Sequence, residues 1–167
     1  MKILNSGALT QTAVQFAKAF GVVLAISLFD AIIGAGISAG LWTNLRNEQT
    51  INDFWQLGLA SFSFFVLYIV GWKNLDVGVA AGLMLTAYLE DTLYYSLLWL
   101  TKPIVFWLSN GVLVVNPGFP SHIGGWVGWI SRFFQMAPPI EVSLPVVFVL
   151  NVAGLVTAWW LLYVENN

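Results

Sequence analysis

The sequence contains no cysteine. This absence excludes disulfide bonds, thiolate metal sites, iron–sulfur clusters and cysteine nucleophiles. Charged residues are scarce as well: they make up 8% of the 167 residues, where soluble domains average about 25%. The net charge is −2 and no basic stretch is present. Nucleic acid is therefore not an expected partner.

The chain is rich in apolar residues. They make up 59% of the chain, and the mean hydropathy is +0.81. They form continuous runs rather than short alternating segments, which favours a helical bundle over a barrel. Nine tryptophans and five tyrosines are typical of the aromatic belts at membrane interfaces. We therefore expect an all-α, multi-pass integral membrane protein whose residues 1–167 form a single helical domain.

Four apolar runs are long enough to cross a hydrocarbon core of about 30 Å. A short turn at residues 73–76 should make the second and third runs antiparallel neighbours. The segment 104–134 begins with an apolar stretch of 12 residues, too short to span, and continues with prolines and glycines. We expect it to be re-entrant or interfacial. The four predicted spans are residues 20–42, 54–72, 77–100 and 142–163.

The third run carries two adjacent acids, Glu90 and Asp91, near its midpoint. Placing a carboxylate at the centre of a membrane span costs about 2.5–3.5 kcal/mol on insertion scales. Two adjacent acids there therefore call for a structural or functional explanation. Asp30 lies near mid-depth in the first run, and Asn151 lies inside the fourth. If these residues converge with His122, they form an oxygen-rich cation site with one imidazole. Such ligands suit a divalent ion such as Mg²⁺, Mn²⁺, Zn²⁺ or Fe²⁺.

The same residues also fit structural roles. Glu90 and Asp91 could be protonated and hydrogen-bonded to nearby hydroxyls as a polar clasp, or one acid could pair with a cation of a neighbouring element. Asp30 and Asn151 could hold helices together, and a lone interfacial His122 is commonly a hydrogen-bonded surface residue. The hydroxyls and cations in question belong to Thr86, Tyr94, Tyr95, Lys18 and Arg132.

Glycines spaced by four predict where helices approach each other closely. One pair is Gly36 and Gly40, in the first run, and the other is Gly78 and Gly82, in the third. Four spans would put both chain termini on one side of the membrane. The basic residues divide equally between the two faces, so they do not indicate which side that is.

Two segments carry a resemblance to a known group. LEDTLYY, residues 89–95, is followed after a gap by NPGFPSHIGGWVGW, residues 116–129. This order resembles a group of small polytopic membrane proteins of unassigned function, in which a Glu-Asp-aromatic span precedes a segment with Trp and His. The 12-residue apolar stretch between 104 and 115 is longer than the link expected for that group. The resemblance implies shared residues around a site and no particular reaction.

Three functions are compatible with these residues. In an intramembrane enzyme, Glu90 and Asp91 would be catalytic, and a metal held by Glu90, Asp91, His122 and Asp30 would activate water or a lipid-derived substrate. In a transporter, the same acids would take up and release a proton or cation. As an accessory subunit, the chain would pair its acids with cations of a larger complex. The expected partners are the lipid bilayer and either further copies of the chain or other membrane subunits.

Overall fold

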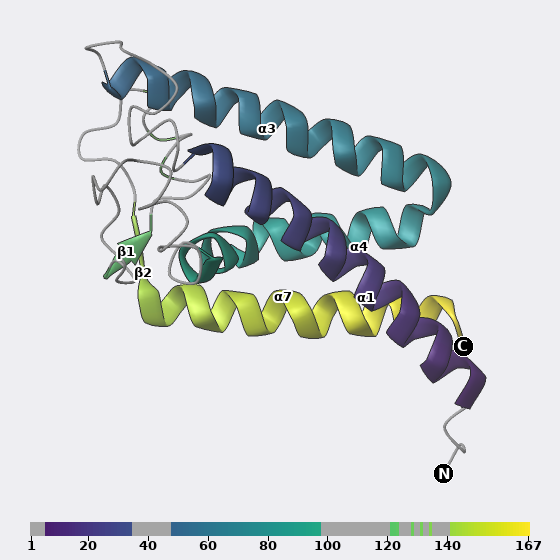
Figure 1. The fold of residues 1–167 in the computed structure, drawn as a ribbon. Coiled ribbons are helices and arrows are strands. Elements are labelled where there is room, and N and C mark those ends of the chain that lie inside the picture. Colours follow the sequence, from purple (N-terminus) through teal and green to yellow (C-terminus); the bar gives the residue numbers. More distant parts are fainter. Residues whose placement is uncertain are drawn as a thin grey trace.

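The structure is a computed structural model that describes residues 6–34, 48–97, 121–123, 128, 131, 134 and 141–167, with the backbone alone at 34, 48–54 and 122. Most of the described chain is helical (Figure 1). A further helix covers residues 89–97. The other elements are α1 (Ser6–Phe29), the π-helix η1 (Asp30–Gly34), α3 (Glu48–Lys73), α4 (Leu75–Thr86), β1 (His122–Ile123), β2 (Val142–Ser143) and α7 (Leu144–Glu165).

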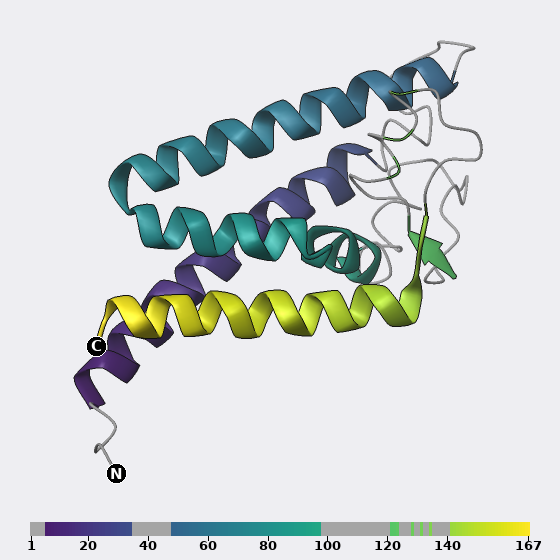
Figure 2. The ribbon, with the colours of Figure 1, turned by 180° about the vertical axis from the view of Figure 1, so that it is seen from behind.

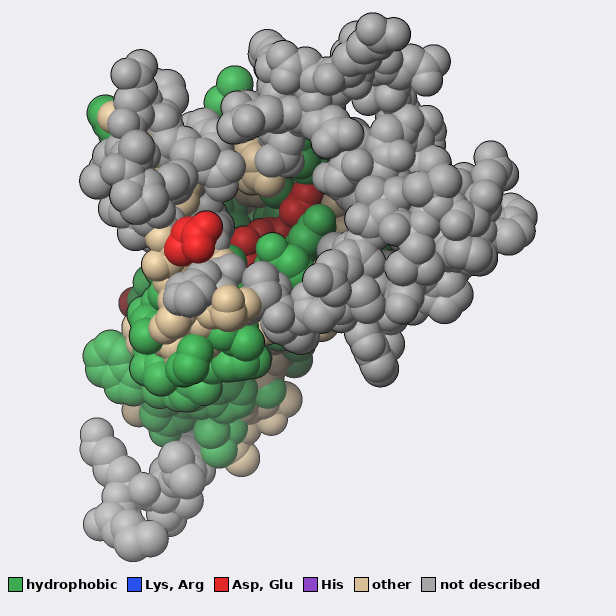
Figure 3. All heavy atoms as spheres, turned by 90° about the vertical axis from the view of Figure 1, so that its left-hand side faces the viewer, with side chains coloured by type: hydrophobic (Ala, Val, Ile, Leu, Met, Phe, Trp, Pro, Cys, Tyr) green, Lys and Arg blue, Asp and Glu red, His purple; other side chains and the backbone are tan. Residues whose placement is uncertain are grey.

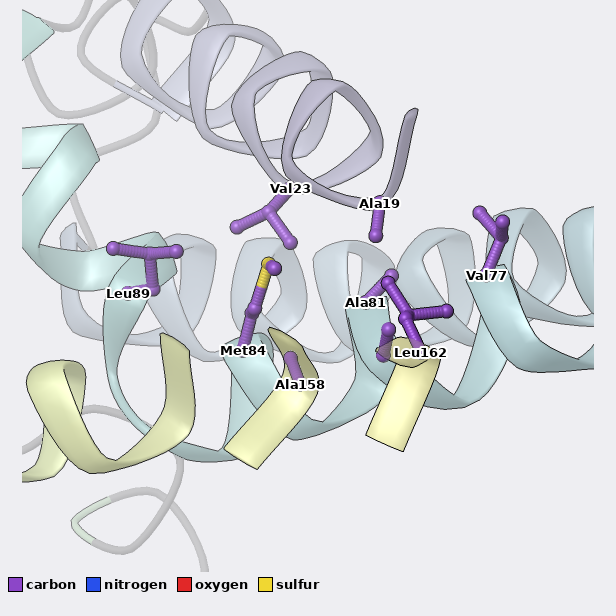
Figure 4. Close-up of a cluster of buried hydrophobic side chains, with 9 residues drawn as sticks. Ala19, Val23, Val77, Ala81, Met84, Leu89, Ala158 and Leu162 are labelled. Carbon is purple, nitrogen blue, oxygen red and sulfur yellow. The ribbon is translucent and has the colours of Figure 1, made fainter. Parts of the chain in front are cut away.

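Helix α4 is the centre of the bundle. It packs against α1, α3 and α7, and the views from the front and from behind agree on this arrangement (Figures 1 and 2). Small side chains such as Ala80 and Ala81 let the neighbouring helices approach closely. Figure 4 shows Ala19 and Val23 of α1 facing α4 across this core. Its fully or nearly buried members are Ala19, Val23, Val77, Ala80, Ala81, Met84, Leu89, Ala158 and Leu162.

Three helices of the described chain are long and apolar enough to cross a bilayer: Ser6–Ile33, Trp55–Lys73 and Leu144–Glu165. Helix α4 is apolar but has only 12 residues, or about 18 Å at a rise of 1.5 Å per residue. The first helix starts at Ser6, well before the predicted start at residue 20. Its added turns are amphipathic, with Thr10 and Gln11 exposed and Ala8 and Thr12 buried.

The start of α1, at Ser6, and the C-terminal end of α7 lie at the same end of the bundle (Figures 1 and 2). Hydrogen bonds between α1 and the end of α7 hold this arrangement. The Asn166 amide donates to Gln15 Oε1 at 2.6 Å and to Thr12 Oγ1 at 3.3 Å. The same Nδ2 donates to the carbonyl of Leu162 at 2.7 Å, which satisfies a backbone acceptor at the end of α7.

A two-residue antiparallel β-pair lies at the opposite end and departs from the predicted all-α fold. His122 pairs with Ser143, and Ile123 pairs with Val142. The Leu144 N–H donates to the Ser121 carbonyl at 2.9 Å, so α7 begins directly from this pair. Most of the predicted re-entrant segment 104–134 lies outside the described residues.

The helix predicted across residues 77–100 is not continuous. Helix α4 ends at Thr86, and Tyr88 has a φ of 65°, in the left-handed region. Such a residue cannot continue a right-handed helix. The chain then turns, and residues 89–97 run in a direction clearly different from α4 (Figures 1 and 2). Sequence periodicity missed this break because neither glycine nor proline marks it.

The predicted glycine packing holds at one position and fails at another. A Cβ on Gly78 would stand 2.7 Å from the Gly71 Cα, so α3 and α4 need a glycine there. A Cβ on Gly82 would meet no atom within 4 Å among the described residues. On the other face of α4, a Cβ on Gly154 of α7 would overlap the Ala87 Cβ. Gly36 and Gly40 lie outside the described residues.

Candidate functional site

Asp30 lies where α1 loses its regular geometry. The α-helix ends at Phe29, and the π-helix η1 begins at Asp30; π-helical turns of this kind are frequent at functional sites. The Asp30 side chain is 7% exposed and accepts a hydrogen bond of 2.6 Å from Trp55 Nε1. The Trp55 ring lies 5.6 Å from that of Phe29, centroid to centroid. This contact orients the indole toward the carboxylate.

Glu90 and Asp91 follow the second break in regular helix. The Thr92 N–H donates to the Tyr88 carbonyl at 3.1 Å, so a new helical ladder starts at Tyr88. Both acids therefore lie in the first turn of helix 89–97 and not in the middle of a long helix. The free N–H groups and the positive dipole end of a helix stabilise negative charge there. The break thus reduces the cost of placing two acids in an apolar setting.

Helix 89–97 is wedged between η1 and α7. On one side, Tyr94 and Leu97 pack against Ala31 of η1. On the other side, Tyr88 belongs to a buried cluster with Ile123 and Val147.

A polar contact also ties helix 89–97 to α7. Asn151 Nδ2 donates to Thr92 Oγ1 at 3.0 Å and to the Val147 carbonyl at 2.7 Å. Asn151 therefore joins two helices, which is the structural role that the sequence left open for it.

Four acids lie within charge-interaction range of Tyr95, whose ring centroid is 5.1 Å from that of Tyr94. The carboxylates of Asp30, Glu90 and Asp91 are near enough to one another for their charges to interact. Glu141, just before β2, is within the same range of Tyr95. Figure 3 shows this face of the molecule, with one acidic side chain at the surface and others set deeper.

Two buried oxygens beside this cluster accept no hydrogen bond from the residues that the structure describes. They are Glu90 Oε1 and Asn151 Oδ1. Buried polar atoms normally have a partner, either protein or water, and an exception calls for an explanation. A bound water, proton or cation would provide one.

The two described lysines lie far from the acids. Lys18 lines a recess with Asn74 at the end of the bundle that holds the termini, and Lys73 precedes Asn74 in the chain. None of these acids lines the recess that holds Lys18, so the structure gives no support to the pairing of an acid with Lys18. The alternative partner, Arg132, lies outside the described residues.

The structure brings together three of the predicted site residues, Asp30, Glu90 and Asp91. Thr86, one of the hydroxyls considered as a partner for the acids, precedes the break; it is exposed and donates to the Leu83 carbonyl at 3.0 Å. The backbone of His122 lies in β1, and the structure does not describe its side chain. Within the described part of the chain, no three His, Asp or Glu side chains are grouped so as to hold a metal ion.

Sequence reasoning missed two members of the site. Trp55 entered the sequence argument only as one of nine tryptophans, because nothing local indicates that an indole 25 residues away will donate to Asp30. Glu141 follows two prolines and precedes a strand of two residues, too short to show any periodicity. No family model, curated protein or solved structure matches the chain, so the site rests on its own geometry.

Proposed function

We propose that this chain is a multi-pass membrane protein that binds a proton or small cation at Asp30, Glu90 and Asp91 and transfers it. The observation that carries the proposal is that two acid-bearing segments both leave regular α-helix at their acids. One becomes a π-helix at Asp30, and the other restarts just before Glu90. Interrupted helices are the usual way in which membrane transporters build ion sites.

Charge repulsion provides the binding chemistry. Three carboxylates within interaction range of one another, in a site of low dielectric, favour the uptake of a proton or cation that relieves their repulsion. The Trp55 N–H and the first turn of helix 89–97 stabilise the negative charge that remains. Glu90 Oε1, buried without a described donor, is the atom best placed to receive the proton.

A proton requires no ligand beyond one of these carboxylates. A monovalent cation would need further oxygen ligands, because the described His, Asp and Glu side chains are not grouped so as to hold a metal ion. A divalent metal, as in the enzyme hypothesis, would require a further ligand from outside the described side chains, and His122 is the natural candidate. Elemental analysis of the purified protein separates the two ideas. One metal ion per chain, lost in His122→Ala, would favour the metal site.

Proteoliposomes with a trapped pH-sensitive dye test the proposal directly. A pH step across the membrane should drive proton flux in the wild type, and Glu90→Gln should abolish it. The amide retains the shape and most of the hydrogen bonding but cannot titrate. A parallel series with Na⁺ or K⁺ gradients and the matching ion-sensitive dyes identifies a cation as the transported species.

The matched control is Glu165→Gln, which removes an exposed acid at the far end of α7. It should leave the flux unchanged. The proposal fails if Glu90→Gln is folded, as judged by its melting temperature, and transports every tested ion at the wild-type rate. In that case Glu90 and Asp91 form a structural clasp.

A second candidate is an accessory subunit, favoured by α3. This helix is the least buried of the three long apolar helices, and it exposes Phe64, Phe65, Tyr68 and Trp72. Such a face fits either lipid or a partner subunit. Native mass spectrometry of the chain purified gently from its source would reveal a stable partner.

A further inference from the structure

We infer that the acid site opens only toward the end of the bundle that carries β1 and β2, and that Glu141 is the residue that draws cations into it. This inference rests on the proposed function and specifies the side from which a proton or cation reaches the acids. Three observations support it: the depth of the site, the position of the apolar core and the exposure of the acids.

The contacts with α7 give the depth of the site. Helix 89–97 meets α7 at Val147 and Asn151. These two residues lie about 5 and 10 Å from the first residue of α7, Leu144, at a rise of 1.5 Å per residue. About 21 Å of helix then separate Asn151 from Glu165 at the other end. The site is thus much closer to the β-pair than to the termini.

The apolar core fills the rest of that distance. Between Asn151 and the end of α7, Ala158 and Leu162 pack with Val23 and Met84, and all four are fully buried. Figure 4 shows these side chains packed between α1, α4 and α7. This apolar cluster lies between Asn151 and a polar group at the end of α7, where Asn166 donates to Thr12 and Gln15. A charged species would have to cross it without any partner, which is highly unfavourable.

The four acids differ in exposure, and the most exposed is the one next to the β-pair. Glu141 is exposed, Asp91 and Glu90 are partly buried, and Asp30 is buried. Tyr95 lies within charge–charge range of all four. Negative groups that line a low-dielectric cleft concentrate cations at its mouth. Glu90 Oε1, which accepts no hydrogen bond from the described residues, is an acceptor within this group of acids.

Because the sequence contains no cysteine, the accessibility of single introduced cysteines can test the path. We would place single cysteines at Tyr95 on the path and at Thr10 on the terminal end, and apply membrane-impermeant thiosulfonate reagents from either side of vesicles. The Tyr95→Cys protein should react only from the face opposite to the one that modifies Thr10→Cys. A cationic reagent should react about tenfold faster than an anionic one of the same size, because the acids concentrate cations.

Glu141→Gln in the Tyr95→Cys protein should remove most of that preference for the cationic reagent. The matched control, Glu165→Gln in the same background, should preserve it. Val142→Cys on β2 serves as the reporter if Tyr95→Cys does not fold. Reaction from the terminal face, from both faces or from neither, or a preference that survives Glu141→Gln, would overturn the inference.

These results are independent of transport. If labelling is one-sided and depends on Glu141 but the flux is unchanged by Glu90→Gln, the inferred path is supported and the proposed transport function is refuted. If the flux depends on Glu90 but labelling is equal from both faces, the proposed function is supported and the one-sided path is refuted.

Discussion

Tyr88 combines a strained backbone with a buried side chain. Its φ of 65° costs a non-glycine residue about 1–2 kcal/mol, and its side chain is only 2% exposed. The packing of a large aromatic ring against Ile123 and Val147 offsets that strain. A left-handed tyrosine is therefore stable here only because its surroundings hold the ring in place.

This balance predicts an inverted ranking of two truncations. Tyr88→Ala and Tyr88→Gly both lose the ring and should each destabilise the fold by about 3 kcal/mol or more. Tyr88→Ala retains the left-handed strain, whereas glycine adopts this φ freely, so the glycine variant should be the more stable by about 1 kcal/mol. Denaturant unfolding in mixed micelles measures both. An alanine variant that equals or exceeds the glycine variant would show that the break is not strained.

The contact between Trp55 and Asp30 is the second residue-scale feature with a measurable energy. Trp55→Phe preserves the ring contact with Phe29 but removes the N–H that donates to the carboxylate. The loss should cost about 1–3 kcal/mol, because the buried oxygen is left without its donor. In an Asp30→Asn background the same change should cost distinctly less. Additive effects in this double-mutant cycle would mean that the negative charge of Asp30 does not strengthen the bond.

At the scale of helices, glycine positions decide how closely α4 can be packed. Gly78→Ala and Gly154→Ala should each destabilise by about 1–3 kcal/mol, because the new methyl meets Gly71 or Ala87. Gly82→Ala is the matched control and should be neutral or slightly stabilising, because its Cβ meets no described atom and helical Gly→Ala substitutions favour the helix. Equal losses at all three positions would contradict this packing.

The helices also show where sequence reasoning succeeds and where it fails. Long apolar runs predicted four spans, and three of them correspond to the three long apolar helices of the described chain. These runs and the polar turn at residues 73–76, which predicted the α3–α4 hairpin, depend on local composition. The end of α4 at Thr86 depends on how Ala87 fits against Gly154 and how the Tyr88 ring packs. Those are tertiary contacts, which leave no periodic signal in the chain.

The same limit applies to the site. The cost of burying acids identified Asp30, Glu90 and Asp91 from the sequence, since few apolar runs tolerate such residues. Their common location was a hypothesis about depth, and the structure brings them within interaction range. Glu141 and Trp55 could not be identified, because an acid in a loop and a tryptophan near a helix start are ordinary in isolation.

At the scale of the whole molecule, the hydrogen bonds of Asn166 to Gln15 and Thr12 hold the start of α1 and the end of α7 at one end of the bundle. In a bilayer, tags at the N- and C-termini should therefore be digested by protease from the same side. Sealed vesicles of known orientation test this, with detergent-opened vesicles as the control. Protection of one tag and digestion of the other would rule out the observed arrangement.

The shortness of α4 affects how the chain could enter a membrane during synthesis. About 18 Å of apolar helix cannot cross a core of about 30 Å, and the chain turns away from the axis of α4 after Thr86. Helix α4 therefore has no stable transmembrane position until α1, α3 and α7 surround it. A nascent chain that stops before α7 should leave the α3–α4 hairpin poorly inserted and exposed to quality-control proteases. The last helix to be synthesised would thus complete both the bundle and the insertion of its central helix.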